Sequence, residues 1–202
     1  MGAEAAPAQV DGRVRRGEEN RSAMVEALIS LWEEGELEPT VAQIAERAGV
    51  AVRSVYGHFG DFESLAAEVV QRQWNVHGKH KDLSPIEGSL DARVEGLVAR
   101  RADLYEAITP VRRAGMLFLH RSETIAANLS QLAQVLRAQA GETFAPELGR
   151  CGPQVSAVLD AVDLLLAWES WERLRTQQGC TKARARRVLE TALIRLLDPT
   201  RE

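Results

Sequence analysis

Apolar residues recur along this chain at the spacing of an α-helix, and no stretch alternates apolar and polar residues as a strand does. The first clear helix is predicted from Arg21 to Glu34, and Gly35 ends it. Its apolar face holds Met24, Ala27, Leu28 and Leu31. The pattern therefore predicts an all-α protein.

Three shorter helical patterns follow. Thr40 is a suitable N-cap for a helix that Gly49 ends, because glycine readily takes the left-handed conformation found there. A third, short helix is predicted from Arg53 to Phe59, and Asp61 is expected to cap a fourth. The apolar stripe of the second helix contains Val41, Ile44, Ala45 and Ala48.

Polar residues with Gly and Pro fill positions 75–88, which makes this segment the best candidate for a domain boundary. We therefore expect a flexible arm over residues 1–17, a small helical domain over 18–75 and a larger helical domain over 76–202. In the larger domain, residues 154–175 read as one continuous helix that is apolar almost all round. Together with a helix over 182–197, it resembles half of an intermolecular four-helix bundle.

The short helices over 40–59 suggest why the chain breaks at Gly49. Two short helices joined by a tight glycine turn and resting on a first helix form a helix-turn-helix. Its second helix projects and can lie in the major groove of DNA. Arg53 can then contact guanine and Val52 a thymine methyl group, while Ser54 is a shorter-range polar reader and Gly57 allows close approach. Thr40, Tyr56 and His58 suit phosphate contacts.

The stretch TVAQIAERAGVAVRSVYGHFGDFESL closely resembles the DNA-binding signature of the tetracycline-repressor-like (TetR) transcriptional regulators. The resemblance covers about 45 residues and implies a three-helix helix-turn-helix domain followed by a ligand-binding and dimerisation domain. It also implies a homodimer that binds a palindromic double-stranded operator as a repressor and is released by a small-molecule effector. By position, Thr40, Tyr56 and His58 match contacts to the DNA backbone. The base-facing positions of the family fall at Val52, Arg53, Ser54 and Gly57.

Two positions depart from the family pattern. Ala51 stands where the family often has a capping Ser, and Phe62 stands where it often has a phosphate-binding Lys. The charge also counts against DNA binding, because the first 80 residues hold 8 Lys and Arg against 13 Asp and Glu. The alternative is therefore a helical small-molecule-binding protein or enzyme that kept the scaffold without binding an operator. If DNA is bound, affinity would depend more on the arginines between Arg13 and Arg21.

Other classes of function find little support. No run approaches the length of a membrane span, and Cys151 and Cys180 are too far apart in sequence for a metal motif, so we expect a cytoplasmic protein without cofactor or metal. His77 and His80 lie in a polar connector and are interpreted as solvated side chains. There is no GxSxG, GxGxxG or Walker motif, so the chain is not expected to be an enzyme.

The effector is expected to be a small apolar or aromatic molecule held between helices of the larger domain. Candidate contacts are polar residues that interrupt apolar stripes and aromatic residues near them. Core packing or surface exposure remains the competing interpretation for each one. These candidates are Arg101, Tyr105, Met116, Phe118, His120, Asp163 and Trp168.

Overall fold

The computed structural model describes residues 8–76 and 82–200, and within these two ranges all regular structure is helical, as predicted. The chain forms two compact units. The first unit consists of residues up to Trp74 together with Pro110–Ala126, and the second of Asn75–Thr109 together with Ala127 onwards. The units therefore divide the chain inside helices, and the predicted division into 18–75 and 76–202 stays a prediction.

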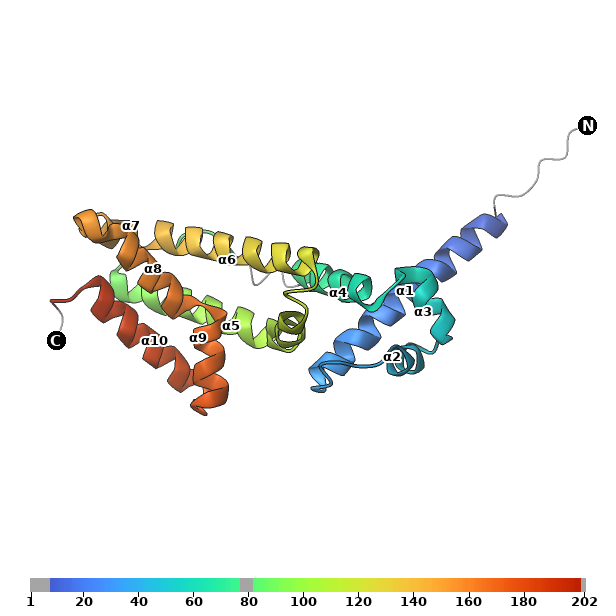
Figure 1. Cartoon of the computed structure of the whole chain (residues 1–202). Helices are drawn as coiled ribbons and strands as arrows, with labels where there is room; N and C mark the ends of the chain where they lie inside the picture. The colour runs from blue at the N-terminus through green and yellow to red at the C-terminus, as the bar shows by residue number, and fades with distance from the viewer. Residues whose placement is uncertain (1–7, 77–81, 201–202) are drawn as a thin grey trace, which may run out of the picture. The chain divides into compact units, whose positions relative to one another are not determined.

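The first helix, α1, spans Ala8–Glu33 and begins well before the predicted start at Arg21 (Figure 1). Its first turns carry no apolar stripe, so hydrophobic periodicity gives no signal for them. They do hold an i,i+4 ion pair, with Arg15 Nε 3.4 Å from Glu19 Oε1. Part of the segment expected to be a flexible arm is thus helical, whereas residues 1–7 lie outside the described residues.

The next two helices confirm the predicted break. Helix α2 spans Val41–Ala48, and Gly49 follows it with φ 67°, in the left-handed region. Helix α3 spans Val52–Phe59. Ala51 provides no side-chain hydrogen bond to cap α3, as expected when alanine replaces a capping serine.

Three helices follow α3, and each of them has residues in both units. Helix α4 spans Phe62–Val76, and the Asp61 carboxylate accepts a hydrogen bond from Ser64 N at 2.7 Å, which confirms the predicted cap. Helix α5 spans Leu90–Leu117 and contains Pro110, the first residue of its part that belongs to the first unit. Helix α6 spans Glu123–Thr143, and Ser122 Oγ accepts from Ile125 N as its cap.

The C-terminal helices include one correction. A short α7, Ala145–Leu148, and a 3-10 turn, Gly152–Gln154, follow α6. The helix predicted over 154–175 is interrupted: α8 spans Val155–Leu166, α9 spans Trp168–Glu172, and a π-helical turn covers Arg173–Gln177. Helix α10, Lys182–Leu197, packs on α8.

The interruption lies at Ala167, whose backbone is extended with ψ 153°. Side chains replace the hydrogen bonds that a continuous helix would make there. The Tyr105 hydroxyl donates to the Leu166 carbonyl at 2.7 Å, and Ser170 Oγ donates to the Leu164 carbonyl at 2.5 Å. Because these donors come from the tertiary structure and from a local turn, the apolar pattern alone did not reveal the break.

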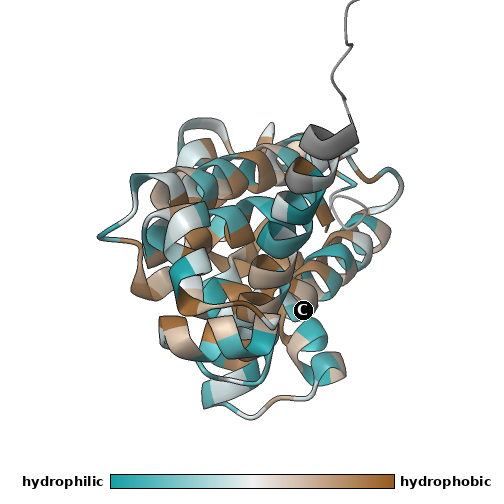
Figure 2. Ribbon diagram, turned by 90° about the vertical axis from the view of Figure 1, so that its right-hand side faces the viewer, coloured by the Kyte–Doolittle hydropathy of each residue, from teal (hydrophilic) through white to brown (hydrophobic). Residues whose placement is uncertain are grey.

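Each unit has its own apolar core, and along the helices hydrophobic and hydrophilic positions alternate in colour (Figure 2). Fully buried residues of the first unit include Met24, Leu28, Trp32, Ile44, Leu65 and Ile125. Those of the second unit include Leu97, Leu104, Phe144, Trp171 and Leu193. No helix within the described ranges is long and apolar enough to cross a membrane.

Candidate nucleic-acid interface

Helix α3 has a buried inner face and an exposed outer face. Val55 and Phe59 are buried, one helical turn apart, whereas Val52, Arg53 and Tyr56 are exposed. Gly57 is also exposed, and a Cβ atom added there would meet nothing within 4 Å. Ser54 and His58 are half-buried at the edges of this surface. The residues predicted to face bases thus lie on the solvent side of α3 or at its edge.

Arg21 of α1 holds the far end of α3 in place. Its Nη1 donates to the His58 carbonyl at 2.8 Å, and its guanidinium carbon lies 4.3 Å from the centroid of the Phe59 ring. The rest of the guanidinium forms a two-fold ion pair with Glu68 of α4. One charged side chain therefore joins α1, α3 and α4, and the orientation of the outer face of α3 depends on it.

Helix α2 begins with a complete capping box. Thr40 Oγ1 accepts from Gln43 N at 3.2 Å, while Gln43 Oε1 accepts from Thr40 N at 2.8 Å and from Thr40 Oγ1 at 2.7 Å. Both residues are exposed. Because its oxygen takes both bonds, Gln43 keeps its amide N–H groups for an outside acceptor. Gln43 was not among the predicted contacts, although the T-x-x-Q spacing of a capping box was visible in the sequence.

Most arginines around this surface are already paired with carboxylates. Arg47 binds Glu34 through two bonds of 2.7 and 2.8 Å, and Arg72 Nη2 lies 2.8 Å from Glu26 Oε1. The pairing with Arg47 lowers the pKa of Glu34. Glu26 and Glu34 of the acidic segment are thus paired with basic residues, and neither Arg21 nor Arg47 is a free cation. Among the described residues of α1 to α3, Arg16 and Arg53 are exposed and take part in no ion pair.

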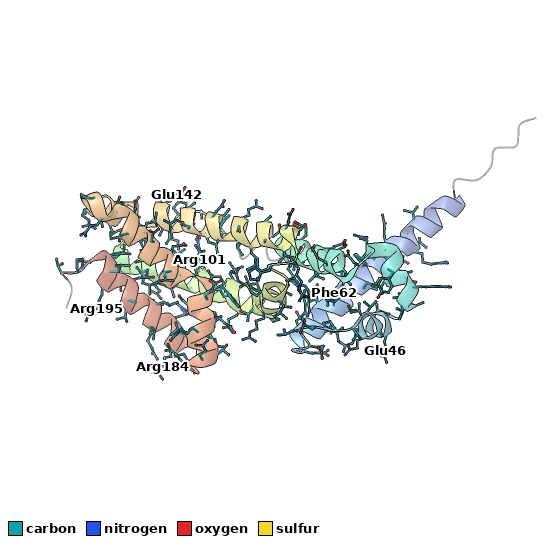
Figure 3. The ribbon with its side chains drawn as sticks, in the orientation of Figure 1. Glu46, Phe62, Arg101, Glu142, Arg184 and Arg195 are labelled. Atoms are coloured by element: carbon teal, nitrogen blue, oxygen red, sulfur yellow. The ribbon has the colours of Figure 1, made fainter. Side chains whose placement is uncertain are left out.

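Phe62, which stands where the family often has a lysine, packs inside the first unit. The side chain is labelled in Figure 3, and its ring centroid lies 5.3 Å from that of Phe118, at an angle of 39°. Phe118 follows α5 and is buried. The first turn of α4 therefore contacts the segment between α5 and α6 through two aromatic rings.

Four of the seven predicted effector contacts belong to the second unit. Arg101 and Tyr105 of α5 are buried, and Trp168 is buried with its indole N–H donating to Thr109 Oγ1 at 3.0 Å. Asp163 is half-buried, and its Oδ2 lies 3.3 Å from Arg137 Nη1. All four thus have partners within the protein, and their role towards an effector stays a prediction.

The other three predicted contacts belong to the first unit. The Phe118 ring packs against that of Phe62, Met116 is half-buried and His120 is exposed. The sequence criteria therefore selected residues from two separate units. His77 and His80 lie outside the described residues, and within the described ranges no group of three His, Cys, Asp or Glu could hold a metal ion.

Comparison with known proteins shows similarity to one family of regulators. Residues 24–69 match the model of the bacterial regulatory proteins of the tetR family. No curated protein sequence matches the chain. A tetR-family transcriptional regulator from Streptomyces coelicolor has a similar fold, with a TM-score of 0.69, 20% identity, and coverage of 89% of this chain and 80% of the other.

Two further solved structures share the fold at low identity. The multidrug binding protein EbrR, complexed with imidazole, gives a TM-score of 0.57 at 17% identity and covers 86% of this chain and 93% of its own. Salmonella enterica GusR gives 0.53 at 18% identity, with 88% and 95% covered. At these identities the likeness shows the fold alone.

The matched residues run from the core of α1 through α2 and α3 to Val69 of α4, which is the part of the chain that presents the outer face of α3. Regulators of this family are DNA-binding transcription factors and not enzymes. The N-terminal helix-turn-helix of this chain, residues 24–69, thus matches the tetR family of bacterial regulatory proteins, and the fold of the chain is similar to that of solved regulators of this family.

Proposed function

We propose that the protein is a repressor that binds a palindromic operator as a homodimer in the cytoplasm and releases it when a small molecule binds. The observation that carries this proposal is the outer face of α3, where Val52, Arg53 and Tyr56 are exposed above a buried Val55 and Phe59. A helix held in this way can enter the major groove with its first residues at the base edges.

Within the groove each side chain has a role that follows from its chemistry. Arg53 binds guanine O6 and N7, Val52 contacts a thymine methyl group and Ser54 accepts or donates one hydrogen bond to a base. Gly57 lets the helix approach the DNA closely. Thr40, Tyr56 and His58 contact phosphates, and the free amide of Gln43 extends the contact at the start of α2.

Arg16 is an additional phosphate contact in this proposal. It stands next to Gly17, where an added Cβ atom would lie 3.8 Å from the His58 ring, so this turn of α1 runs beside the end of α3. Arg16 is exposed and unpaired, unlike Arg21 and Arg47. Phe62 stands at the start of α4 where the family often has a positively charged lysine. Arg16 supplies a positive charge near α3 instead.

The homodimer forms through the outer faces of α8 and α10. Leu164 is 68% exposed, and Val155 and Val188 are also exposed large apolar residues. A shallow concavity follows α10 and is lined by Arg184, Arg187, Val188, Thr191 and Ala192. Apolar surface on two packed helices is typical of a two-fold four-helix interface.

The effector is a small apolar or aromatic molecule bound in the second unit near Tyr105 and Trp168. It acts through α5, which runs from the second unit into the first and contains Pro110 where the units divide. A proline inside a helix removes one backbone hydrogen bond, which weakens the helix at that point. Beyond it, Phe118 contacts Phe62 at the start of α4, directly after α3.

Release requires that the effector bind more tightly to the conformation with misplaced recognition helices. A tenfold loss of operator affinity corresponds to about 1.4 kcal/mol of such a difference. Burial of about 55 Å² of additional apolar surface would supply it.

Selection of bound DNA from a random pool tests the proposal. Enrichment of palindromic sequences by the wild-type protein supports it, and Arg53→Ala serves as the matched variant, whose enriched sequences should lose the preferred base at one symmetric position in each half. The competing function, a small-molecule-binding protein on the same scaffold, predicts that no sequence is enriched. Trp168 and Trp171 make intrinsic fluorescence a second readout, because effector binding near them should change it while operator affinity falls.

A further inference from the structure

Helix α5 buries two arginines in the second unit, and only one of them has a counter-ion. Arg93 is 7% exposed and Arg101 is 3% exposed. Arg93 forms a two-fold ion pair with Glu147, with both bonds at 2.8 Å, and also donates to the Thr143 carbonyl at 2.6 Å. A buried charge normally has such a partner, because an unpaired one is costly to remove from water.

Arg101 has only neutral partners. Its Nη1 donates to Gln139 Oε1 at 2.7 Å and its Nη2 to the Leu136 carbonyl at 2.8 Å, both on α6. Arg101 is labelled in Figure 3. Its Nε is buried without any hydrogen-bond partner. Burial lowers the pKa of the Arg101 guanidinium, although Tyr105 and Asp163 act on it electrostatically in the opposite direction. Arg101 nevertheless stays charged at neutral pH, because an arginine cannot lose its proton in proteins.

Asp163, the carboxylate that acts electrostatically on Arg101, is paired with another residue. Asp163 makes its ion pair with Arg137 at 3.3 Å, and Arg137 also binds Asp160 at 2.5 Å. No ion pair joins Arg101 to a carboxylate among the described residues. The second unit thus presents a guanidinium whose charge is not matched by direct contact.

The donors that remain on Arg101 match one kind of ligand group. A guanidinium has five N–H donors, and two are used by Gln139 and Leu136. The Nε–H and the remaining Nη–H groups form a planar fork, which a carboxylate accepts through two parallel bonds. A carboxylate also carries a single negative charge at neutral pH, whereas a phosphate monoester carries nearly two.

We propose that the effector is an apolar carboxylic acid and that its carboxylate binds Arg101. This inference rests on the proposed effector response and names the chemical class of the effector. The apolar part of the acid lies among the buried side chains of α5 beside Arg101, which include Leu97, Val98, Leu104 and Tyr105. Arg93, by contrast, serves the fold alone, because Glu147 already satisfies its charge.

Matched pairs of acid and amide test the inference on the full-length protein. The probes are octanoate with octanamide and 4-phenylbutyrate with 4-phenylbutyramide, each titrated by calorimetry and by tryptophan fluorescence. An acid and its amide have nearly the same apolar body, so the comparison isolates the charge. At least one acid should bind ten or more times more tightly than its amide.

Two variants assign the preference to the residue. Arg101→Gln should abolish the difference between acid and amide, while the affinity for the amide stays unchanged. Arg100→Gln is the control, because Arg100 is the neighbouring residue and its side chain pairs with Asp82 at the surface. It should leave the preference intact.

Equal binding of acids and amides, or binding of no acid, overturns the inference. Because this comparison needs only the wild-type protein, it decides the question even if Arg101→Gln does not fold. Failure of the proposed function is a separate result, since it would appear as the absence of enriched operator sequences. An acid that binds through Arg101 without changing operator affinity would support the site and contradict the coupling.

Discussion

The Nη1 atom of Arg21 donates to the carbonyl oxygen of His58 at 2.8 Å, so that α1 holds the last turn of α3. The same guanidinium binds Glu68 of α4 and lies over the Phe59 ring. Arg21 therefore positions the proposed DNA-binding surface through its contacts within the protein. This distinguishes Arg21 from the exposed Arg16 and Arg53.

Arg21→Ala should lower the free energy of unfolding of the protein by about 1 to 3 kcal/mol, because it removes charge-assisted hydrogen bonds and leaves Glu68 unpaired. Urea unfolding measures this loss. The salt dependence of operator binding should keep its slope, since Arg21 contacts no phosphate. A slope reduced by about one would show that Arg21 contacts DNA directly.

Arg53→Ala should relax base preference at one symmetric position in each half of the operator, with a cost of about 1 to 3 kcal/mol for each two-fold contact to guanine. Binding to a set of operators with single base changes measures it. Arg47→Ala is the matched control, because Arg47 is paired with Glu34. An equal loss of affinity for every operator would contradict base recognition by Arg53.

Arg16→Ala should weaken binding to all DNA sequences alike and reduce the slope of log affinity against log salt by about 0.9. Tyr56→Phe should likewise weaken all sequences equally, because it removes a phosphate contact, but it should leave the slope unchanged. Fluorescence anisotropy over a salt series gives both quantities. Arg15→Ala serves as the comparison, since Arg15 already pairs with Glu19 on the surface of α1.

Leu164→Glu or Val188→Glu should yield a folded monomer, because both side chains lie exposed on the proposed dimer interface. Sedimentation measures the mass and circular dichroism the fold. Leu193→Glu should instead unfold the protein, since Leu193 of α10 is 0% exposed within a single chain. A wild-type protein that sediments as a monomer at micromolar concentration would remove the basis for this interface.

Glu147→Gln should lower the free energy of unfolding by about 3 to 5 kcal/mol at neutral pH, because Arg93 would remain buried without its counter-ion. Burial by itself raises the pKa of Glu147, but the ion pair with Arg93 outweighs this effect and holds the pKa below its ordinary value. The pair therefore stabilises the protein fully at neutral pH. Its contribution is lost as the pH falls below about 4, through the lowered pKa.

Unfolding measured between pH 7 and pH 3 should show the loss in the wild-type protein and a smaller one in Glu147→Gln. The control is Glu190→Gln, whose partner Arg186 lies 3.5 Å away in a loose pair on α10. If both variants followed the same pH dependence as the wild type, Glu147 would not be the group that titrates.

Local sequence determined helices α2 and α3 and the turn between them. The cap at Thr40, the apolar residues Ile44 and Val55, and the left-handed Gly49 all act within a few residues of one another. Such signals depend on short-range sterics and hydrogen bonds, so they can be recognised in the amino-acid sequence. The exposed face of α3 could be read in advance for the same reason.

Only the tertiary structure decided which charged residues are unpaired and which apolar residues are exposed. Arg21 and Arg53 look alike in the sequence, yet Glu68 lies 47 positions from Arg21 and pairs with it. In the same way, Tyr105 lies 61 positions before Leu166 and donates a hydrogen bond to the Leu166 carbonyl, where the helix is interrupted at Ala167. Leu193 and Val188 both belong to the apolar pattern of α10, but packing on α8 buries only Leu193. Residues far apart in the sequence decide these differences, because the fold determines which charged residues form ion pairs and which apolar residues are buried.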